Sequence, residues 1–208
     1  MTRDSFIHKE VAGAPGGPLL FVFHGTGGDE NQFLGLGRHL MPDATIVSPR
    51  GDVSEHGAAR FFRRTGEGVY DMEDLARATQ KMTAFIETHR DDKKPSAIVG
   101  LGYSNGANIL ASVLFARPGL FDSTVLMHPL IPFEPEVAGK FAGTQILITA
   151  GRHDPICPAP LTERLAGDFA RHGATVEMLW HDGGHEVRPA EMEAAQRFLT
   201  RDKTGAAS

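Results

Sequence analysis

The sequence contains a single cysteine, Cys157, so no disulfide can form within the chain. A chain without disulfides suits a reducing compartment, and we expect a cytoplasmic protein. The sequence also lacks a basic start followed by an apolar stretch, which is the pattern of a secretory signal peptide. No segment reaches the roughly 20 apolar residues that a transmembrane helix needs. We therefore expect no membrane span.

Basic runs are also missing, and the formal net charge is −5 at pH 7. This charge argues against nonspecific binding of nucleic acid. The chain has 208 residues, of which 41% are hydrophobic, and this is enough to bury a sizeable core. We expect one domain over residues 1–208, with a frayed polar tail at about 201–208.

Short apolar runs alternate with amphipathic stretches along the chain. The runs predict strands at 19–23, 44–48, 97–101, 124–127, 145–149 and 175–180, with a further strand around 6–11. The amphipathic stretches predict helices at 30–40, 71–89, 105–116, 160–172 and 189–201. Near-continuous apolar strands between helices are typical of a mostly parallel, doubly wound α/β sheet flanked by helices. Residues 49–69 form the one long irregular stretch, and such loops are often functional.

The most informative motif is Gly102-Tyr103-Ser104-Asn105-Gly106, directly after an apolar run. A strand that turns sharply into a helix brings the residues two before and two after the serine close together, which favours glycine at both. Ser104 would lie at the apex with a strained backbone and an exposed hydroxyl. The alternative is a phosphate-binding loop, but the lysine of such a loop is absent. We therefore interpret Ser104 as a nucleophile.

Polar residues follow several predicted strands, and the carboxyl ends of parallel strands meet at one edge of a sheet. A serine hydroxyl needs an adjacent base to attack at neutral pH, and His185 can accept its proton. Asp154 can fix the histidine tautomer and stabilise the imidazolium, with Glu134 as the alternative acid. The order Ser104, Asp154, His185 is one of the chain orders of convergent catalytic triads.

The tetrahedral intermediate of such a reaction needs N–H donors aimed at its oxygen. The backbone N–H of Asn105, directly after the nucleophile, is one candidate donor. The glycine-rich segment after the first long strand offers a second donor at Thr26, with His24 bracing the loop.

Residues 60–64 are the best clue to substrate specificity. We expect Phe61 and Phe62 to form the wall of an apolar pocket and Arg63 or Arg64 to meet a substrate carboxylate. The alternative is a loop with solvated arginines and with both phenylalanines in the core. His128, at a strand end, is a further candidate for lining the pocket.

Metal chemistry is not expected. His181 and His185 have the spacing of a helical zinc pair, but the glycines between them disfavour a helix, and no glutamate follows His181. Cys157 is more typical of a small packed residue than of a nucleophile. We expect no cofactor and no metal.

Together these motifs resemble the α/β-hydrolase superfamily, and within it the small bacterial carboxylesterase/phospholipase group related to acyl-protein thioesterases and dienelactone hydrolases. The resemblance covers about residues 19–198 and is most specific at 24–30, 60–64, 102–106, 151–156 and 183–185. It implies a triad of Ser104, Asp154 and His185 and an oxyanion hole of Thr26 and Asn105. Dienelactone hydrolases proper carry a cysteine nucleophile, whereas this chain has Ser104. Residues 127–145 are too short for a large cap, so a minimal α/β-hydrolase fold is expected.

The expected function is a serine hydrolase that cleaves small carboxylic esters through an acyl-enzyme. Thioesters and lysophospholipids are alternative substrates. A non-catalytic small-ligand binding protein on the same fold is the alternative from another class, since fold alone does not fix function. Such proteins often lack a triad member, whereas all three candidates are present here. The expected partner is a small-molecule ester, no nucleic acid is expected, and a homodimer is left open.

Overall fold

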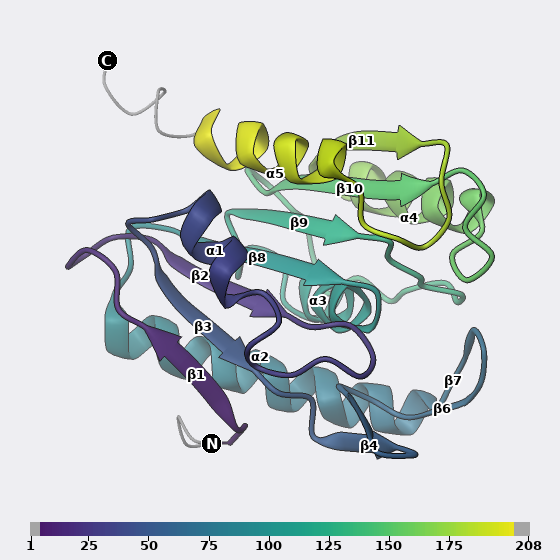
Figure 1. The fold of residues 1–208 in the computed structure, drawn as a ribbon, viewed down its shortest axis with the longest axis horizontal. Coiled ribbons are helices and arrows are strands. Elements are labelled where there is room, and N and C mark those ends of the chain that lie inside the picture. The colour runs from purple at the N-terminus through teal and green to yellow at the C-terminus, as the bar shows by residue number, and fades with distance from the viewer. Residues whose placement is uncertain (1–4, 202–208) are drawn as a thin grey trace.

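The computed structural model describes residues 5–201, so almost all of the tail expected to fray, 202–208, lies outside the described residues. Seven strands form one sheet in the order β1-β3-β2-β8-β9-β10-β11 (Figure 1). Their bounds are β1 His8–Val11, β2 Leu19–Phe23, β3 Thr45–Pro49, β8 Ile98–Tyr103, β9 Ser123–Met127, β10 Gln145–Gly151 and β11 Thr175–His181. Among these strands β1 alone runs antiparallel to its neighbour. The mostly parallel α/β sheet that we predicted is confirmed.

Helices cover both faces of the sheet. Those with described bounds are α1 Leu34–Leu40, α2 Met72–Lys93, α3 Asn105–Ala116, α4 Ala159–Arg171 and α5 Pro189–Arg201. Alternate side chains of β2 explain the two layers, because successive residues of a strand point to opposite faces. Phe21 packs with α2 and α3, whereas Leu20 and Val22 pack in the core beneath α1 and α5. Figure 1 shows α1 and α5 on the near face of the sheet and α2 and α3 on the far face. Burial on both faces accounts for the uninterrupted apolar runs.

Two expected segments differ from the structure in detail. The helix expected at 30–40 begins only at Leu34, since the Asp29 carboxylate accepts the N–H of Asn31 and holds a turn in its place. The irregular stretch 49–69 contains two short hairpins, formed by β4 Val53–Glu55 with β5 Ala58–Arg60 and by β6 Arg64–Gly66 with β7 Val69–Tyr70.

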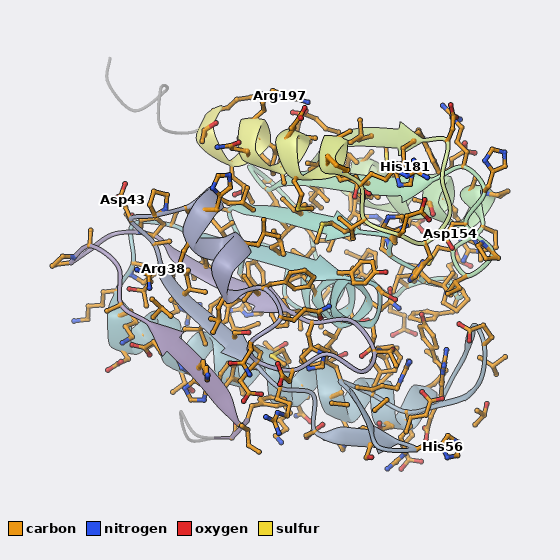
Figure 2. All side chains as sticks on the ribbon, in the orientation of Figure 1. Arg38, Asp43, His56, Asp154, His181 and Arg197 are labelled. Atoms are coloured by element: carbon orange, nitrogen blue, oxygen red, sulfur yellow. The ribbon has the colours of Figure 1, made fainter. Side chains whose placement is uncertain are left out.

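The parallel strands of the sheet end at one common edge. These strands point the same way, and Figure 2 shows Asp154 and His181 at the end towards which β9, β10 and β11 run. Within the described residues the connection from β9 to β10 contains neither helix nor strand, so this connection forms no large cap. None of the helices in the described part of the chain is long and apolar enough to cross a membrane.

Candidate active site

The turn between β8 and α3 exposes Ser104. Its backbone adopts φ 52° and ψ −117°, a strained conformation for a residue with a side chain. A Cβ on Gly102 would lie 2.6 Å from the carbonyl oxygen of Gly106, and a Cβ on Gly106 would lie 2.3 Å from that of Phe23. Glycine is therefore required on both sides of the serine by close backbone contacts.

Three loops at this edge bring Ser104, Asp154 and His185 together. His185 Nε2 lies 2.8 Å from Ser104 Oγ, and His185 Nδ1 lies 2.7 Å from Asp154 Oδ2. The carboxylate can only accept, so Nδ1 carries the proton and Nε2 is left to accept the serine proton. Glu134, the alternative acid, is exposed on a different loop.

The Asp154 carboxylate is almost fully buried and fully bonded. Its Oδ1 accepts the backbone N–H groups of Ile156 at 2.8 Å and Cys157 at 3.0 Å. Burial raises the pKa of Asp154, but hydrogen bonds from His128, His185 and the two backbone groups outweigh it and hold this pKa well below its usual range. Asp154 is therefore ionised at neutral pH, as the orienting acid of a triad must be.

The two predicted oxyanion donors face the same cavity as Ser104. Asn105 is the first residue of α3, so its backbone N–H has no partner within the helix. Residues 60–61 tie the two donors in place: Arg60 Nη1 donates to Thr26 Oγ1 at 2.7 Å, and the Phe61 N–H donates to Asn105 Oδ1 at 2.8 Å. A rigid, preorganised pair of donors is what oxyanion stabilisation requires.

His24 braces the glycine-rich loop from below. Its Nε2 accepts the N–H of Gly51 at 2.9 Å, so the proton lies on Nδ1, which donates to the Gly25 carbonyl at 2.7 Å. Burial lowers the pKa of His24, which keeps the ring in this neutral tautomer.

Phe61 and Phe62 do not form the pocket wall that we predicted. Their exposed fractions are 1% and 0%, and both belong to the hydrophobic core. Phe61 stacks beside His24 with ring centroids 4.6 Å apart, and Phe62 packs edge-on against Tyr70 at 4.8 Å. The alternative of core packing is the correct one for these two residues.

Arg63 is also outside the cavity. Its side chain is 61% exposed, and its guanidinium forms ion pairs with Asp71 at 3.2 Å and Asp74 at 3.3 Å. These contacts fasten the loop to the start of α2. The structure does not support a contact of Arg63 with a substrate carboxylate, because Arg63 is not among the residues that line the cavity at Ser104 and its guanidinium is already paired.

The cavity above Ser104 has a volume of about 190 Å³. It is lined by Thr26, Arg60, Arg64, Glu67, Gly68, Tyr70, Tyr103, Ser104, Asn105, Asn108, Leu130, Ile156, Cys157 and His185. Of residues 60–64, only Arg60 and Arg64 line this cavity. Both form ion pairs with Glu55, at 3.3 Å for Arg60 and 3.0 Å for Arg64. Strand alternation gives no signal that separates the arginines from the phenylalanines, because Phe62 has the same parity as Arg60 and Arg64 and residues 61–63 lie between β5 and β6.

His128 does not line the cavity either, contrary to our prediction. It is completely buried behind Asp154, with Nδ1 2.9 Å from Asp154 Oδ2 and Nε2 3.2 Å from Glu191 Oε2. Sequence analysis missed Glu191. In the sequence Glu191 has only the position of a capping glutamate, because it is the third residue of α5. In the structure its side chain does accept the Arg188 N–H, at 2.6 Å.

A larger groove of about 520 Å³ lies between α2, α3 and residues 133–136. Among the described residues that line it there is no histidine, aspartate or cysteine. The catalytic chemistry therefore belongs to the smaller cavity at Ser104.

The chain is similar in sequence and in fold to known proteins. The model of the dienelactone hydrolase family matches residues 54–190. MhqD of Bacillus subtilis (strain 168) is 39% identical over 184 residues, which are 86% of this chain and 91% of that protein. Atu2452 of Agrobacterium tumefaciens str. C58 has 59% identity and a TM-score of 0.92, covering 96% of this chain and 98% of its own.

A Bacillus cereus carboxylesterase has 36% identity and a TM-score of 0.90, covering 96% of this chain and 95% of its own. This neighbour is a known esterase, and the fold of the present chain, with its uncapped parallel sheet, superposes on it over almost its full length. The chain belongs to the dienelactone hydrolase family of the α/β-hydrolase superfamily and is a carboxylic ester hydrolase.

Proposed function

We propose that the protein hydrolyses small carboxylic esters through a covalent acyl-enzyme formed on Ser104. The observation that carries this proposal is the continuous hydrogen-bonded chain from Ser104 Oγ through His185 to Asp154, with distances of 2.8 and 2.7 Å. A nucleophile, its base and an orienting acid in direct contact are the requirements of acyl transfer at neutral pH.

In the first half of the reaction, Ser104 Oγ attacks the ester carbonyl carbon while His185 Nε2 takes the hydroxyl proton. Asp154 stabilises the imidazolium that forms. The backbone N–H groups of Thr26 and Asn105 stabilise the oxyanion, and such a donor is worth about 2.7–4 kcal/mol in a studied serine hydrolase. The intermediate collapses, the alkoxide leaves with the proton from His185, and the acyl group stays on Ser104.

In the second half, a water molecule takes the place of the alcohol. His185 removes its proton as the oxygen attacks the acyl carbon, and the same two N–H groups bind the second oxyanion. Collapse returns the proton to Ser104 Oγ and releases the carboxylic acid. His185 thus serves as base and acid in alternation, for which Nε2 must begin unprotonated.

The size of the cavity supports small substrates. Its volume of about 190 Å³ is below the roughly 300–1,000 Å³ of sites that enclose drug-sized ligands. Tyr70 closes one side, where its hydroxyl donates to the Leu130 carbonyl at 2.7 Å. We infer that short acyl groups fit and long ones must remain in solvent.

We expect kcat/KM to fall at least about tenfold, or ~1.4 kcal/mol, between p-nitrophenyl butyrate and p-nitrophenyl octanoate. Ile156 lines the cavity and is only partly buried, so Ile156→Ala enlarges the space for the acyl chain at little cost in stability. This variant is expected to gain activity on octanoate relative to butyrate. The measurement is kcat/KM over a series of acyl lengths.

Ile7→Ala is the matched control, because Ile7 is 65% exposed and remote from the cavity. It is expected to keep the wild-type preference. A wild-type protein that hydrolyses octanoate as fast as butyrate would contradict the proposed small-substrate specificity.

A further inference from the structure

One carboxylate oxygen of Asp154 serves two histidines. His185 Nδ1 lies 2.7 Å and His128 Nδ1 2.9 Å from the same atom, Oδ2. The His185 ring also contacts Ser104, whereas the His128 ring is buried in the protein interior and does not line the cavity. Both Asp154 and His128 have side chains with no exposed surface, so water does not compete for these contacts.

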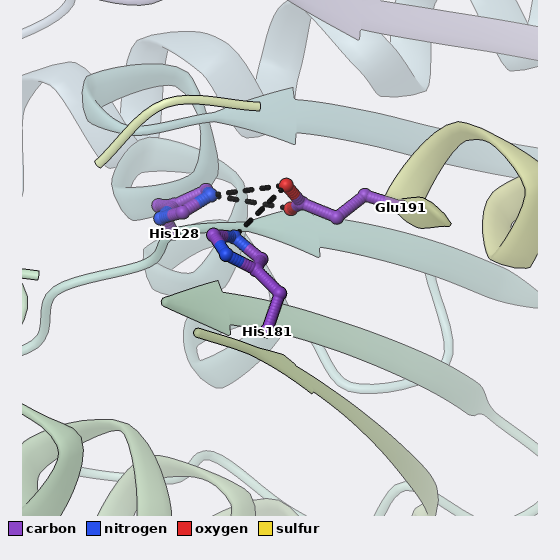
Figure 3. A group of neighbouring side chains, drawn as sticks. All are labelled: His128, His181 and Glu191. Carbon is purple, nitrogen blue, oxygen red and sulfur yellow. Dashed lines mark hydrogen bonds and ion pairs between the residues drawn. The ribbon is translucent and has the colours of Figure 1, made fainter. Parts of the chain in front are cut away.

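The far side of His128 faces a second buried carboxylate. Its Nε2 lies 3.2 Å from Glu191 Oε2 (Figure 3). Glu191 is held in place by the hydroxyl of Thr149, which donates at 2.5 Å, and by the N–H of Arg188 at 2.6 Å. A carboxylate only accepts hydrogen bonds, so both nitrogens of a ring between two ionised carboxylates must carry protons. This geometry makes His128 an imidazolium.

The electrostatic balance agrees with the geometry. Burial lowers the pKa of His128, but hydrogen bonds and charge interactions with Asp154 and Glu191 outweigh it and raise this pKa to about 9. Burial likewise raises the pKa of Glu191, and its bonds to His128, Thr149 and the Arg188 N–H lower it overall. The three groups therefore form a buried unit of two anions and one cation at neutral pH.

A metal ion on His128, His181 and Glu191 is the alternative occupant of this cluster, because their ligand atoms lie within 4.8 Å of one another. The hydrogen bonds disfavour it. His128 carries a proton on each ring nitrogen, one towards Asp154 and one towards Glu191, and the Gly183 N–H donates to His181 Nδ1 at 3.0 Å. A ring nitrogen that carries a proton has no lone pair for a metal.

We propose that His128 is a positioning residue for the catalytic base: as a fixed cation it holds Asp154 Oδ2 against His185 and offsets part of the negative charge that His185 faces. This role rests on the proposed function of Ser104, Asp154 and His185. With His128 in place, the buried unit has a net charge of −1. Without it, two carboxylates act on His185 with no nearby cation, and its protonated, inactive form is favoured.

The other titratable groups that face His128 come from several neighbouring elements. Three rings lie near the His128 ring: His181 on β11 at a centroid distance of 5.4 Å, His185 after β11 at 5.2 Å, and Tyr103 on β8 at 5.9 Å. The fourth group is Cys157 after β10, whose Sγ donates to the His128 carbonyl at 3.2 Å. Burial raises the pKa of both Tyr103 and Cys157, so both stay neutral.

The test is the pH dependence of kcat/KM for p-nitrophenyl acetate in His128→Gln, Glu191→Gln and His181→Gln. His128→Gln removes the cation and keeps an N–H for Asp154, so we expect the acid limb to move to higher pH, by about one unit or more. Glu191→Gln removes an anion, and the limb is expected to move to lower pH. His181→Gln is the matched control, because it removes a ring of the same cluster that lies against Glu191 and not against Asp154. The acid limb is expected to keep its wild-type position.

If His128 had a purely structural role, His128→Gln and Glu191→Gln would lower the rate but would not move the acid limb of the pH profile in opposite directions. That result would overturn the proposal. If the variants do not fold, the wild-type protein provides the second measurement. The two ring nitrogens of His128 are expected to show the ¹⁵N shifts of an imidazolium at pH 7, and a neutral ring there would also overturn it. This spectrum does not depend on turnover, so it separates failure of this proposal from failure of the triad.

Discussion

Replacing Ser104 with alanine is expected to abolish ester hydrolysis, with a loss in kcat of about 10⁶-fold, as for removal of the nucleophile in a well-studied serine protease. The hydroxyl oxygen 2.8 Å from His185 Nε2 is the atom that forms the covalent bond in our proposal, and alanine leaves no substitute. Alanine has the same Cβ as serine, so the φ of 52° at this position adds no strain that Ser104 does not already bear. Hydrolysis of p-nitrophenyl acetate and a melting curve of the same sample separate lost chemistry from lost folding.

Two matched variants sharpen this result. Ser112→Ala makes the same change on the same helix, where the hydroxyl only donates to the Asn108 carbonyl, and near-wild-type activity is expected. Cys157→Ala is also expected to stay active. The Cys157 sulfur lies 3.8 Å from His185 Nδ1, the nitrogen that already serves Asp154, and burial raises the pKa of the thiol so that little thiolate forms. If Ser104→Ala kept a tenth of the activity, Ser104 would not be the nucleophile.

Asp154→Asn is expected to lower kcat by about 10⁴-fold, the loss seen for the same change in another catalytic triad. Asp154 accepts four N–H donors: the rings of His128 and His185 on one oxygen and the backbone of Ile156 and Cys157 on the other. An amide offers only one accepting oxygen, so its NH₂ group must face donors whichever way it turns. His185 then loses the acceptor that keeps its proton on Nδ1.

The same substitution is expected to reduce the free energy of unfolding by about 3–5 kcal/mol, because it breaks a buried ion pair from one side. Glu134→Gln is the matched control, since Glu134 is the exposed alternative acid, and it is expected to change neither kcat nor stability. The measurements are kcat at pH 8 and urea unfolding. A larger loss of kcat in Glu134→Gln than in Asp154→Asn would reverse the assignment of the acid.

The parts of the molecule that the sequence predicts well are those set by local or periodic patterns. The apolar runs at 19–23 and 145–149 correspond to β2 Leu19–Phe23 and β10 Gln145–Gly151, because central parallel strands are buried on both faces. Gly102 is required by a contact within the turn, with the Gly106 carbonyl, and is readable without the rest of the fold, whereas Gly106 is required by the Phe23 carbonyl at the end of β2. Chain order and strand ends together then bring Ser104, Asp154 and His185 to one edge.

The parts that sequence analysis missed depend on contacts between distant segments. Phe61 lies in the core, and its backbone N–H donates to the side-chain oxygen of Asn105, 44 residues later in the chain. No local sequence pattern predicts this bond. His128 follows a strand end as expected, but its backbone has φ 50°, and its ring turns inward to meet a glutamate 63 residues away. That glutamate, Glu191, looks in the sequence like an ordinary helix cap.

Intact-protein and peptide mass spectrometry after treatment with a fluorophosphonate probe tests directly whether Ser104 forms a covalent intermediate. Attack of an activated serine on phosphorus displaces fluoride and leaves a stable phosphonate ester on Oγ. We predict one adduct per chain, located on Ser104, and no labelling of Ser104→Ala. Adduct formation on another residue, or equal labelling of the wild-type protein and Ser104→Ala, would contradict the account.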